Sequence, residues 1–276
     1  MARGFIKVAA CAAAALLALA GCSSTATSGS TTSAAATSAA AGGTEAALTT
    51  VKAGTLTVCS DIPYPPFEFE DPNSSGYTGF DIDIINEIAQ RLNLKVSVQV
   101  TNFDALQSGA ALAAGQCDMG VSAITITDER KANLDFADPY YDSLQSLLVK
   151  KDSGITSLAD LAGKRIGVQT GTTGQNYAKE NAPATATLVD METDGLLWPA
   201  IQAGQIDAIL QDYPVNLQHE KDDPNYSVIE KYDTKEQYGF ALAKGKNPAL
   251  LAAINTQLKA IRDDGTYQTI YNKYFS

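Results

Sequence analysis

The sequence predicts an α/β protein made of two similar lobes, in which helices cover mainly parallel sheets. Strand-like and helix-like patterns alternate along the chain, which is the rhythm of βαβ units. The chain also repeats itself, since AGQCD at 114–118 and AGQID at 203–207 each join a predicted helix to an apolar strand. A further strand pattern, RIGV at 165–168, restarts the rhythm of the first strand and therefore begins a second α/β lobe.

The predicted elements of the first lobe follow one another in the βαβ order. The apolar run LTVC at 56–59 predicts a short strand. A helix follows, with Asp81 as its expected N-cap, because four apolar residues recur at helical spacing: Ile84, Ile85, Ile88 and Leu92. Alternating apolar residues over 94–100 then predict the next strand.

The end of the chain predicts a helix that packs on the core. Its apolar residues form one stripe, namely Leu250, Leu251, Ile254, Leu258 and Ile261. Gly265 is a suitable residue to end that helix, because glycine readily adopts the left-handed conformation of a helix C-terminus.

The N-terminal segment predicts export. Arg3 and Lys7 precede an apolar run over 8–20 that is too short for a permanent membrane span. The run ends in LAGC at 19–22, which resembles the bacterial lipobox, whose cysteine, here Cys22, becomes the lipidated mature N-terminus. An ordinary cleavable signal with an incidental cysteine is the alternative. We expect residues 1–21 to be a lipoprotein signal peptide and the exported product to be lipid-anchored on the extracytoplasmic face of the cell membrane.

A low-complexity segment separates this signal from the folded part. Residues 22–50 are almost entirely Ser, Thr, Ala and Gly, a composition that favours a flexible, disordered linker. Without Arg3 and Lys7 the chain has 18 basic and 31 acidic side chains, a net charge of −13. Nucleic acid and anionic membrane surfaces are therefore poor partners.

Two cysteines lie in the predicted folded part. Cys59 is late in one predicted strand and Cys117 is at the start of another. If these strands are parallel neighbours, the two residues are several positions out of level and beyond the ~7 Å Cα separation that a disulfide spans. We therefore expect two unpaired, buried thiols.

The repeats predict where a ligand binds. Aligning them places Ala123 opposite Asp212, both just past the ends of equivalent strands. In open α/β sheets, ligands bind outside the carboxyl ends of the strands. Ala123, Thr125 and Asp212 are therefore expected to face one cleft between the lobes.

From Thr55 to Phe275 the sequence resembles the polar amino-acid-binding proteins of ABC importers, that is, bacterial solute-binding protein family 3, of the glutamine- and histidine-binding type. The motifs that carry this resemblance are DIPYPPF at 61–67, GFDID at 79–83, ITITDER at 124–130, GTT at 171–173, QD at 211–212 and DGTY at 264–267. The resemblance implies a periplasmic-binding-protein-like type II fold. Lobe 1 would comprise 51–145 and 242–276 and lobe 2 would comprise 146–241, with crossings near 146–149 and 238–242.

The resemblance also implies a site for the backbone of an α-amino acid. Arg130, the start of a predicted helix, would bind the α-carboxylate through its guanidinium fork. Thr125 would add a hydroxyl, the backbone of Ala123 and Ile124 would add polar groups, and Thr172 and Thr173 would present backbone N–H groups at a helix start. Asp212 would accept hydrogen bonds from the α-ammonium group.

Further matched positions would line the pocket for the solute's side chain. Tyr64 and Phe103 would enclose its aliphatic part. Asp61 would bind a basic or an amide group, and the sequence alone does not decide which. Gln169 and Gln211 would add neutral amides, which suit an uncharged or basic side chain better than an acidic one.

The expected function is capture of a polar α-amino acid by a monomer, without catalysis, and its delivery to an ABC transporter permease. Two alternatives stay open: an amino-acid-like solute such as ectoine or an opine, and a dehydratase of prephenate-like acids on the same fold. No nucleotide is expected, because GTTG at 171–174 lacks the Gly-Lys-Ser/Thr of a phosphate loop. No cofactor and no metal are expected, because no Cys/His cluster has metal-ligand spacing. His219, the only histidine, is expected to be a surface residue. Trp198, beside Pro199, is expected to lie in the core of lobe 2.

Overall fold

A computed structural model of the chain describes residues 48–276. The predicted signal peptide at 1–21, with Cys22, and nearly all of the predicted linker at 22–50 lie outside the described residues. Within the described part, no helix is both long and apolar enough to cross a membrane.

The first sheet has the strand order β4-β1-β5-β12-β6. β1 (Thr55–Ser60) runs parallel to β4 (Lys95–Val100) and to β5 (Met119–Gly120). β12 (Ala241–Ala243) joins antiparallel to β5 and to β6 (Leu134–Phe136). β1 is buried along nearly its whole length, as expected for a parallel strand covered on both faces.

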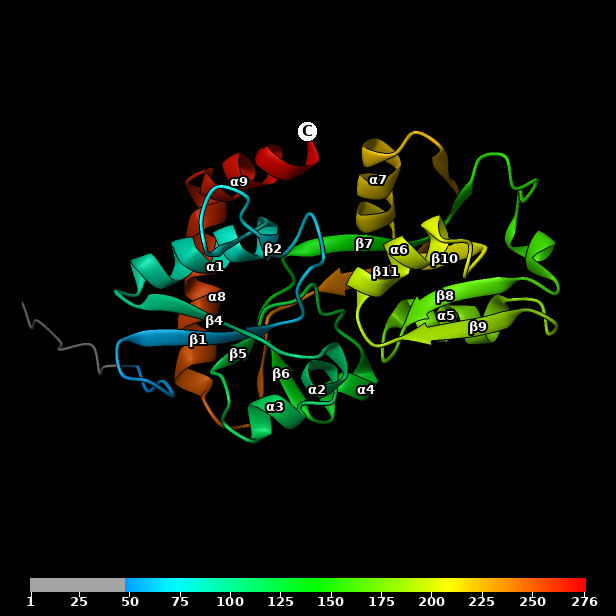
Figure 1. The fold of residues 1–276 in the computed structure, drawn as a ribbon. Coiled ribbons are helices and arrows are strands. Elements are labelled where there is room, and N and C mark those ends of the chain that lie inside the picture. The colour runs from blue at the N-terminus through cyan, green and yellow to red at the C-terminus, as the bar shows by residue number, and fades with distance from the viewer. Residues whose placement is uncertain (1–47) are drawn as a thin grey trace, which may run out of the picture. The chain divides into compact units, whose positions relative to one another are not determined.

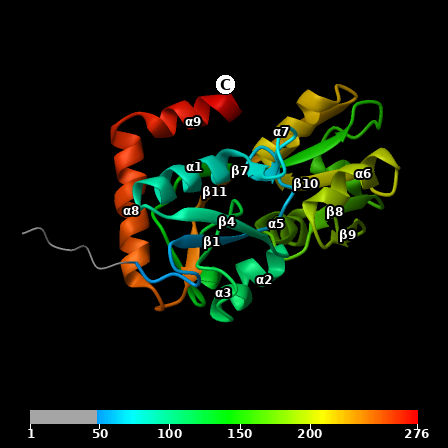
Figure 2. The same ribbon diagram turned by 60° about the vertical axis from the view of Figure 1, so that its left-hand side comes forward.

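Helices cover both faces of this sheet (Figures 1 and 2). On one side lie α1 (Phe80–Arg91) and α9 (Thr266–Phe275), and on the other lie the short helices α2 (Phe103–Gln107) and α3 (Ala110–Ala113). α8 (Pro248–Asp263) packs against α1 and α9. The predicted apolar stripes of α1 and α8 are confirmed as core, because Ile84, Ile88, Ile254 and Leu258 are fully buried. We call this sheet, with α1–α3, α4 (Asp128–Lys131), α8, α9 and the small hairpin of β2 (Phe69–Glu70) and β3 (Tyr77–Thr78), lobe 1.

The second sheet has the order β11-β7-β10-β8-β9. β8 (Arg165–Gln169) is parallel to β9 (Thr187–Met191) and β10 (Ala208–Asp212), whereas β7 (Tyr141–Lys150) is antiparallel to β10 and to β11 (Tyr226–Tyr238). The helices α5 (Thr173–Asn181), α6 (Leu197–Gln202) and α7 (Tyr213–Asp222) pack on this sheet. Single turns of 3-10 helix occur at η1 (Leu158–Leu161) and η2 (Asp194–Leu196). We call this part lobe 2.

The chain passes twice between the two sheets. The first passage lies at 137–140, between β6 and β7, and the second at 239–240, between β11 and β12. The expected first crossing at 146–149 instead lies inside β7, where Ser146 and Val149 pair with β10. Polar residues at the start of β7, such as Asp142 and Gln145, obscure its strand pattern in the sequence.

The two repeats have the same structural task. Each ends in an aspartate, Asp118 or Asp207, that immediately precedes β5 or β10. A carboxylate oxygen of Asp118 accepts the N–H of Thr57 on β1 at 2.8 Å, and a carboxylate oxygen of Asp207 accepts the N–H of Arg165 on β8 at 2.8 Å. Each aspartate therefore fixes its strand beside the first strand of its lobe.

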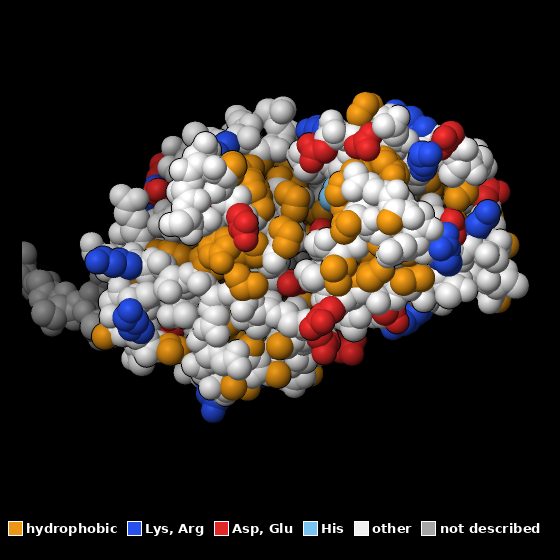
Figure 3. Space-filling model, viewed as in Figure 1, with side chains coloured by type: hydrophobic (Ala, Val, Ile, Leu, Met, Phe, Trp, Pro, Cys, Tyr) orange, Lys and Arg blue, Asp and Glu red, His pale blue; other side chains and the backbone are white. Residues whose placement is uncertain are grey.

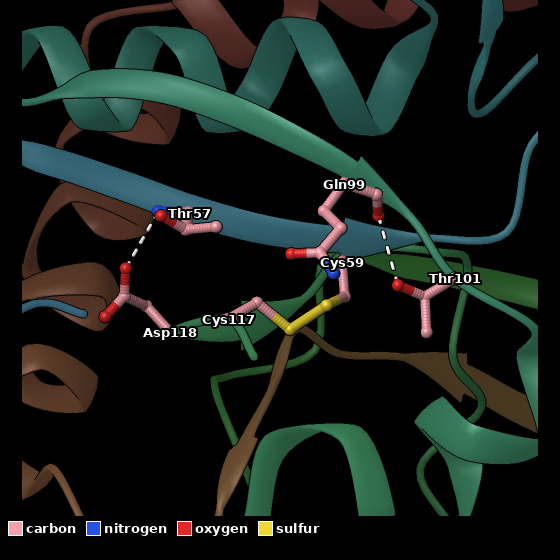
Figure 4. The surroundings of a disulfide bond; sticks show 6 residues. All are labelled: Thr57, Cys59, Gln99, Thr101, Cys117 and Asp118. Carbon is pink, nitrogen blue, oxygen red and sulfur yellow. Dashed lines mark hydrogen bonds between the residues drawn. A yellow bond between two sulfur atoms is a disulfide. The ribbon is translucent and has the colours of Figure 1, made fainter. Parts of the chain in front are cut away.

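The expectation of unpaired thiols is wrong, because Cys59 and Cys117 form a disulfide with a Cα separation of 5.8 Å (Figure 4). The expectation treated Cys117 as part of a straight strand. In the structure β5 begins only at Met119, which pairs with Val58. Cys117 lies in the turn after α3, and its sulfur reaches Cys59 from that turn (Figure 4). Both residues are buried, as expected.

His219 is also placed differently from the prediction. It is only 6% exposed, and its ring stacks on Trp198 with centroids 4.3 Å apart. The polar neighbours of His219 suggested a solvated helix, but His219 lies on the buried side of α7, against Trp198. Burial lowers the pKa of His219 to about 4.

We expect His219 to make stability fall with acid. A buried imidazole that stays neutral in the folded protein but titrates at its ordinary pKa of 6.5 in the unfolded chain stabilises the fold above pH 6.5. That stability is lost as the pH falls from 6.5 to about 4. His219→Phe keeps a ring against Trp198 without the titration. Relative to this variant, the wild type should lose roughly 2–3 kcal/mol of unfolding free energy between pH 7 and 4.5, measured by denaturant titration. A difference that is independent of pH would contradict the buried neutral imidazole.

Candidate functional site

A cavity lies between the two lobes. Both lobes contribute to its wall. The residues that line it are Asp61, Tyr64, Phe103, Ser122, Ala123, Thr125, Arg130, Gln169, Thr172, Thr173 and Asp212. The structure thus brings together ten of the twelve residues that the sequence singled out for ligand binding.

The turn after β5 forms part of the lobe 1 wall. Ala123 has φ of 44°, a left-handed conformation that is uncommon for a residue with a side chain. Its N–H donates to Oδ2 of Asp81 at 2.9 Å. The neighbouring Ser122 hydroxyl donates to Oε1 of Glu68 at 2.7 Å and accepts the N–H of Asp61 at 3.0 Å. Two buried carboxyl groups therefore hold this wall in one conformation.

Asp81 has a different role from the expected helix cap. Gly79 is the N-cap of α1, at φ of 129°, and a Cβ there would approach the carbonyl oxygen of Phe67 to 2.1 Å. Asp81 instead lies in the first turn, fully buried, and accepts hydrogen bonds from Ala123 and Tyr140. Burial raises the pKa of Asp81 to about 7, and burial followed by the charge of Asp81 raises that of Glu68.

Arg130, in α4, is one of the residues that line the cavity. Thr127 is the N-cap of this helix, since its hydroxyl accepts the N–H of Arg130 at 3.1 Å. The side chain is 5% exposed and its guanidinium lies over the ring of Phe103, 5.3 Å from the centroid. It donates to the carbonyl oxygens of Thr125 at 2.8 Å and Gly171 at 2.9 Å. Burial lowers the pKa of Arg130 only to about 10, so the group stays cationic near neutral pH.

The lobe 2 wall comes from the carboxyl ends of β8 and β10. Gln169 ends β8, and Thr172 caps α5 by accepting the N–H of Gln175 at 3.0 Å. Asp212 ends β10 and is 7% exposed. Although it precedes α7, its side chain does not cap that helix. It accepts hydrogen bonds from the hydroxyls of Tyr64 at 2.7 Å and Tyr238 at 2.5 Å, while burial raises its pKa to about 7.

The lobes contact each other directly across the cavity. Tyr64 of lobe 1 donates to Asp212 of lobe 2, and Gln169 of lobe 2 donates to Asp61 of lobe 1 at 2.5 Å. Arg130 of lobe 1 reaches the carbonyl oxygen of Gly171 in lobe 2. The donors and acceptors of the two walls thus face one another in a closed arrangement.

Two of the singled-out residues do not line the cavity. Ile124 is fully buried and packs in the apolar cluster that contains Cys59, and its carbonyl oxygen accepts the N–H of Gly239 at 3.1 Å. Gln211 is also buried, and its amide donates to Asn216 at 3.0 Å. Neighbouring side chains of a strand point to opposite faces, which separates Gln211 from the lining residue Asp212 in β10.

The sequence reading missed three polar groups at the site. Ser122 directly precedes Ala123 and is itself a lining residue. Asp194 follows β9, and the same strand-end rule that singled out Asp212 could have found it. Glu236 accepts hydrogen bonds from the hydroxyls of Thr125 at 3.0 Å and Thr173 at 2.9 Å. It lies in the polar strand β11, where nothing in the sequence distinguishes it.

Comparisons with known proteins agree with this architecture. Residues 56–276 match the family described as bacterial extracellular solute-binding proteins, family 3. The chain is 35% identical over 216 residues to the ABC transporter glutamine-binding protein GlnH of Bacillus subtilis (strain 168), covering 75% of this chain and 76% of GlnH. It is 33% identical to the L-cystine-binding protein TcyJ of Escherichia coli (strain K12), covering 84% and 86% of the two chains.

Solved structures show the same fold. An ancestral arginine-binding protein bound to arginine matches with a TM-score of 0.74 and 37% identity, over 81% of this chain and 99% of that one. The ancestral amino acid-binding protein AncCDT-1, a precursor of cyclohexadienyl dehydratase, matches with a TM-score of 0.74 and 39% identity, over 81% and 96%. The chain belongs to the bacterial extracellular solute-binding proteins of family 3, and it has their two-lobed α/β fold of the type II periplasmic-binding-protein class.

Proposed function

We propose that this chain captures a polar α-amino acid between its lobes and delivers it to an ABC transporter permease, without catalysing a reaction. One observation carries the proposal: Arg130 of lobe 1 and Asp212 of lobe 2 line the same cavity. Both are buried, and neither forms an ion pair with another described residue. An α-amino acid supplies the two opposite charges that these groups lack.

The proposed contacts follow from the chemistry of the wall. The guanidinium of Arg130 pairs with the α-carboxylate through two parallel N–H···O bonds, while the backbone N–H groups at the start of α5, at Thr172 and Thr173, add donors. Asp212 accepts hydrogen bonds from the α-ammonium. Tyr64 and Phe103 contact the aliphatic part of the side chain. Since these groups come from both lobes, solute stabilises the closed arrangement relative to an open one.

The wider biological setting is part of the same proposal. The relatives are, by their names, binding proteins for glutamine, arginine, cystine and histidine, and the family is extracellular. Cys22 carries the lipid that anchors the exported chain, residues 22–50 are its tether, and the chain acts as a monomer. The lobes swing about the two passages between the sheets, at 137–140 and 239–240.

We expect calorimetry across the twenty amino acids to find at least one that binds with micromolar or tighter affinity. Ectoine and an opine belong in the same panel, because both present a carboxylate and a cationic nitrogen. If only ectoine or the opine produced binding heat, that compound and not an amino acid would be the solute. Absence of binding across the whole panel would refute the proposed function.

A second function is favoured by one observation, the likeness to a dehydratase precursor. Burial brings the pKa of Asp61 to about 6 and that of Asp212 to about 7, where a carboxyl group can act as a general acid. Incubation with prephenate or arogenate, followed by detection of the aromatic product, tests this candidate. Turnover that is lost in Asp212→Asn would establish it in place of simple binding.

A further inference from the structure

This inference rests on the proposed function. When an α-amino acid is bound, the part of the cavity around its side chain has an excess of negative charge. The α-carboxylate and α-ammonium of an amino acid offset Arg130 and Asp212. Asp61 is then the remaining charged group of the cavity wall. It is 7% exposed, and the hydrogen-bond donor that its side chain contacts is the neutral amide of Gln169.

A second buried carboxyl group lies close to Asp61. Asp194, in η2 of lobe 2, is 2% exposed, and within the described part of the chain its buried Oδ1 has no hydrogen-bond partner. Burial, followed by the charges of Asp61 and Asp212, raises the pKa of Asp194 to about 8. Burial, followed by the charges of Asp212 and Asp194, raises that of Tyr64. Asp194 therefore lies close to three residues of the cavity wall.

Asp61 and Asp194 approach each other because the lobes meet at this point. Gly195 of lobe 2 lies against Pro63 of lobe 1, so closely that a Cβ on Gly195 would be 3.2 Å from the proline ring. Two like charges from opposite lobes oppose closure, whereas a cation between them favours it. A neutral side chain would leave the two carboxyl groups uncompensated, and an acidic one would add a third. No group of three or more His, Cys, Asp or Glu in residues 48–276 is arranged to hold a metal ion instead.

We propose that Asp61 and Asp194 together bind a cationic side chain, so that the solute is an α-amino acid ending in a guanidinium or a primary ammonium group. Asp194 sets the preference for such a cation over a neutral side chain of the same shape. Asp61 contacts the cation from lobe 1, and Asp194 supports it from lobe 2. A cationic side chain thus offsets the repulsion between the carboxylates of Asp61 and Asp194 when the lobes close. A neutral or acidic side chain does not.

Arginine and citrulline test this proposal, because they differ in charge but hardly in shape. We expect the wild-type protein to bind arginine about 100-fold more tightly than citrulline in calorimetry, as is typical for loss of a buried charged hydrogen-bond partner. Asp194→Asn should reduce that ratio at least about tenfold by weakening arginine, with citrulline affinity nearly unchanged. Asp152→Asn is the matched control, since it removes the same charge from a side chain of lobe 2 that is 73% exposed.

The pH dependence of the ratio is a second readout that needs no variant. The pKa values of Asp61 and Asp194 are raised in the free protein to about 6 and about 8. The groups that surround the pair are Glu192 after β9, Asp212 after β10, and Tyr64 and Glu68 of lobe 1. Asp212 acts on both solutes alike, because both have the α-ammonium. Ionisation of the pair should therefore make the arginine-to-citrulline ratio rise from pH 5 to pH 9.

The outcomes separate this inference from the proposed function. Citrulline or glutamine binding as tightly as arginine, or a ratio that does not change with pH, would overturn the cation-binding pair while amino-acid binding stands. Absence of binding for all of these solutes would overturn the proposed function itself. If Asp194→Asn does not fold, the wild-type ratio and its pH dependence still decide.

Discussion

Arg130→Ala should abolish amino-acid binding, weakening the affinity for the preferred amino acid at least about 1000-fold. The guanidinium is buried at 5% exposure, and its present partners are the neutral carbonyl oxygens of Thr125 and Gly171. A solute carboxylate bound there makes two charge-assisted hydrogen bonds in a site with little water, so their loss is costly. Calorimetry with the preferred amino acid measures the effect.

Matched variants separate recognition from folding. Arg130→Lys keeps the charge but loses the fork, and we expect an affinity between those of the wild type and the alanine variant. Lys131→Ala removes a positive charge from the next residue, which is exposed, and should leave the affinity unchanged. Circular dichroism shows whether Arg130→Ala still folds. Affinity retained within threefold in a folded Arg130→Ala protein would refute the carboxylate clamp.

The position of Arg130 could be predicted from the sequence because it depends on local patterns. Asp128, Glu129 and Lys131 are exposed in the structure, as a charged run suggests, and Arg130 alone is buried. A strand end followed by a short capped helix placed it at the edge of the sheet, where open α/β sheets bind ligands. The internal repeat placed Asp212 at the corresponding edge of the other sheet. Strand ends and repeats are local features, so one sequence reveals them.

Features that depend on long-range packing could not be predicted in this way. Asp194 lies near Asp61, 133 positions away along the chain, only because η2 packs on the other lobe, where Gly195 lies against Pro63. Glu236 reaches Thr125 and Thr173 from the strand that leads back to lobe 1. His219 is buried although its neighbours in sequence are polar, since its burial depends on Trp198. These residues lie beside partners that no local pattern identifies.

Hydrophobic side chains gather along the junction of the two lobes on the face seen in Figure 3, and acidic side chains lie among them. On one side of this junction α7 faces α9, and Tyr213, Pro214, Tyr274 and Phe275 line a hollow between them. Aromatic rings continue beneath it, since Tyr141 stacks on Tyr238 at a centroid distance of 5.5 Å. Aromatic rings therefore pack around the passages between the sheets.

Removing the disulfide should cost lobe 1 much of its stability. The bridge joins residues 58 positions apart, and the chain-entropy description of a loop of that length gives about 4 kcal/mol of unfolding free energy. The double variant Cys59→Ala/Cys117→Ala should lose that amount in guanidinium denaturation. The expected effect on amino-acid affinity is small, because β1 stays paired with β4 over its whole length and Asp118 still bonds to Thr57.

Reducing agent supplies the control, because it should lower the stability of the wild type to that of the double variant and leave the variant unchanged. Oxidation itself is checked by alkylating the denatured, unreduced protein and analysing the peptides by mass spectrometry. Peptides that contain Cys59 and Cys117 should remain joined and unalkylated. Alkylated Cys59 and Cys117 in the exported protein would contradict the bridge. The turn after α3 would then be held to β1 by the bonds of Asp118 to Val51 and Thr57, which come from the same repeat that in lobe 2 fixes β10 without any cysteine.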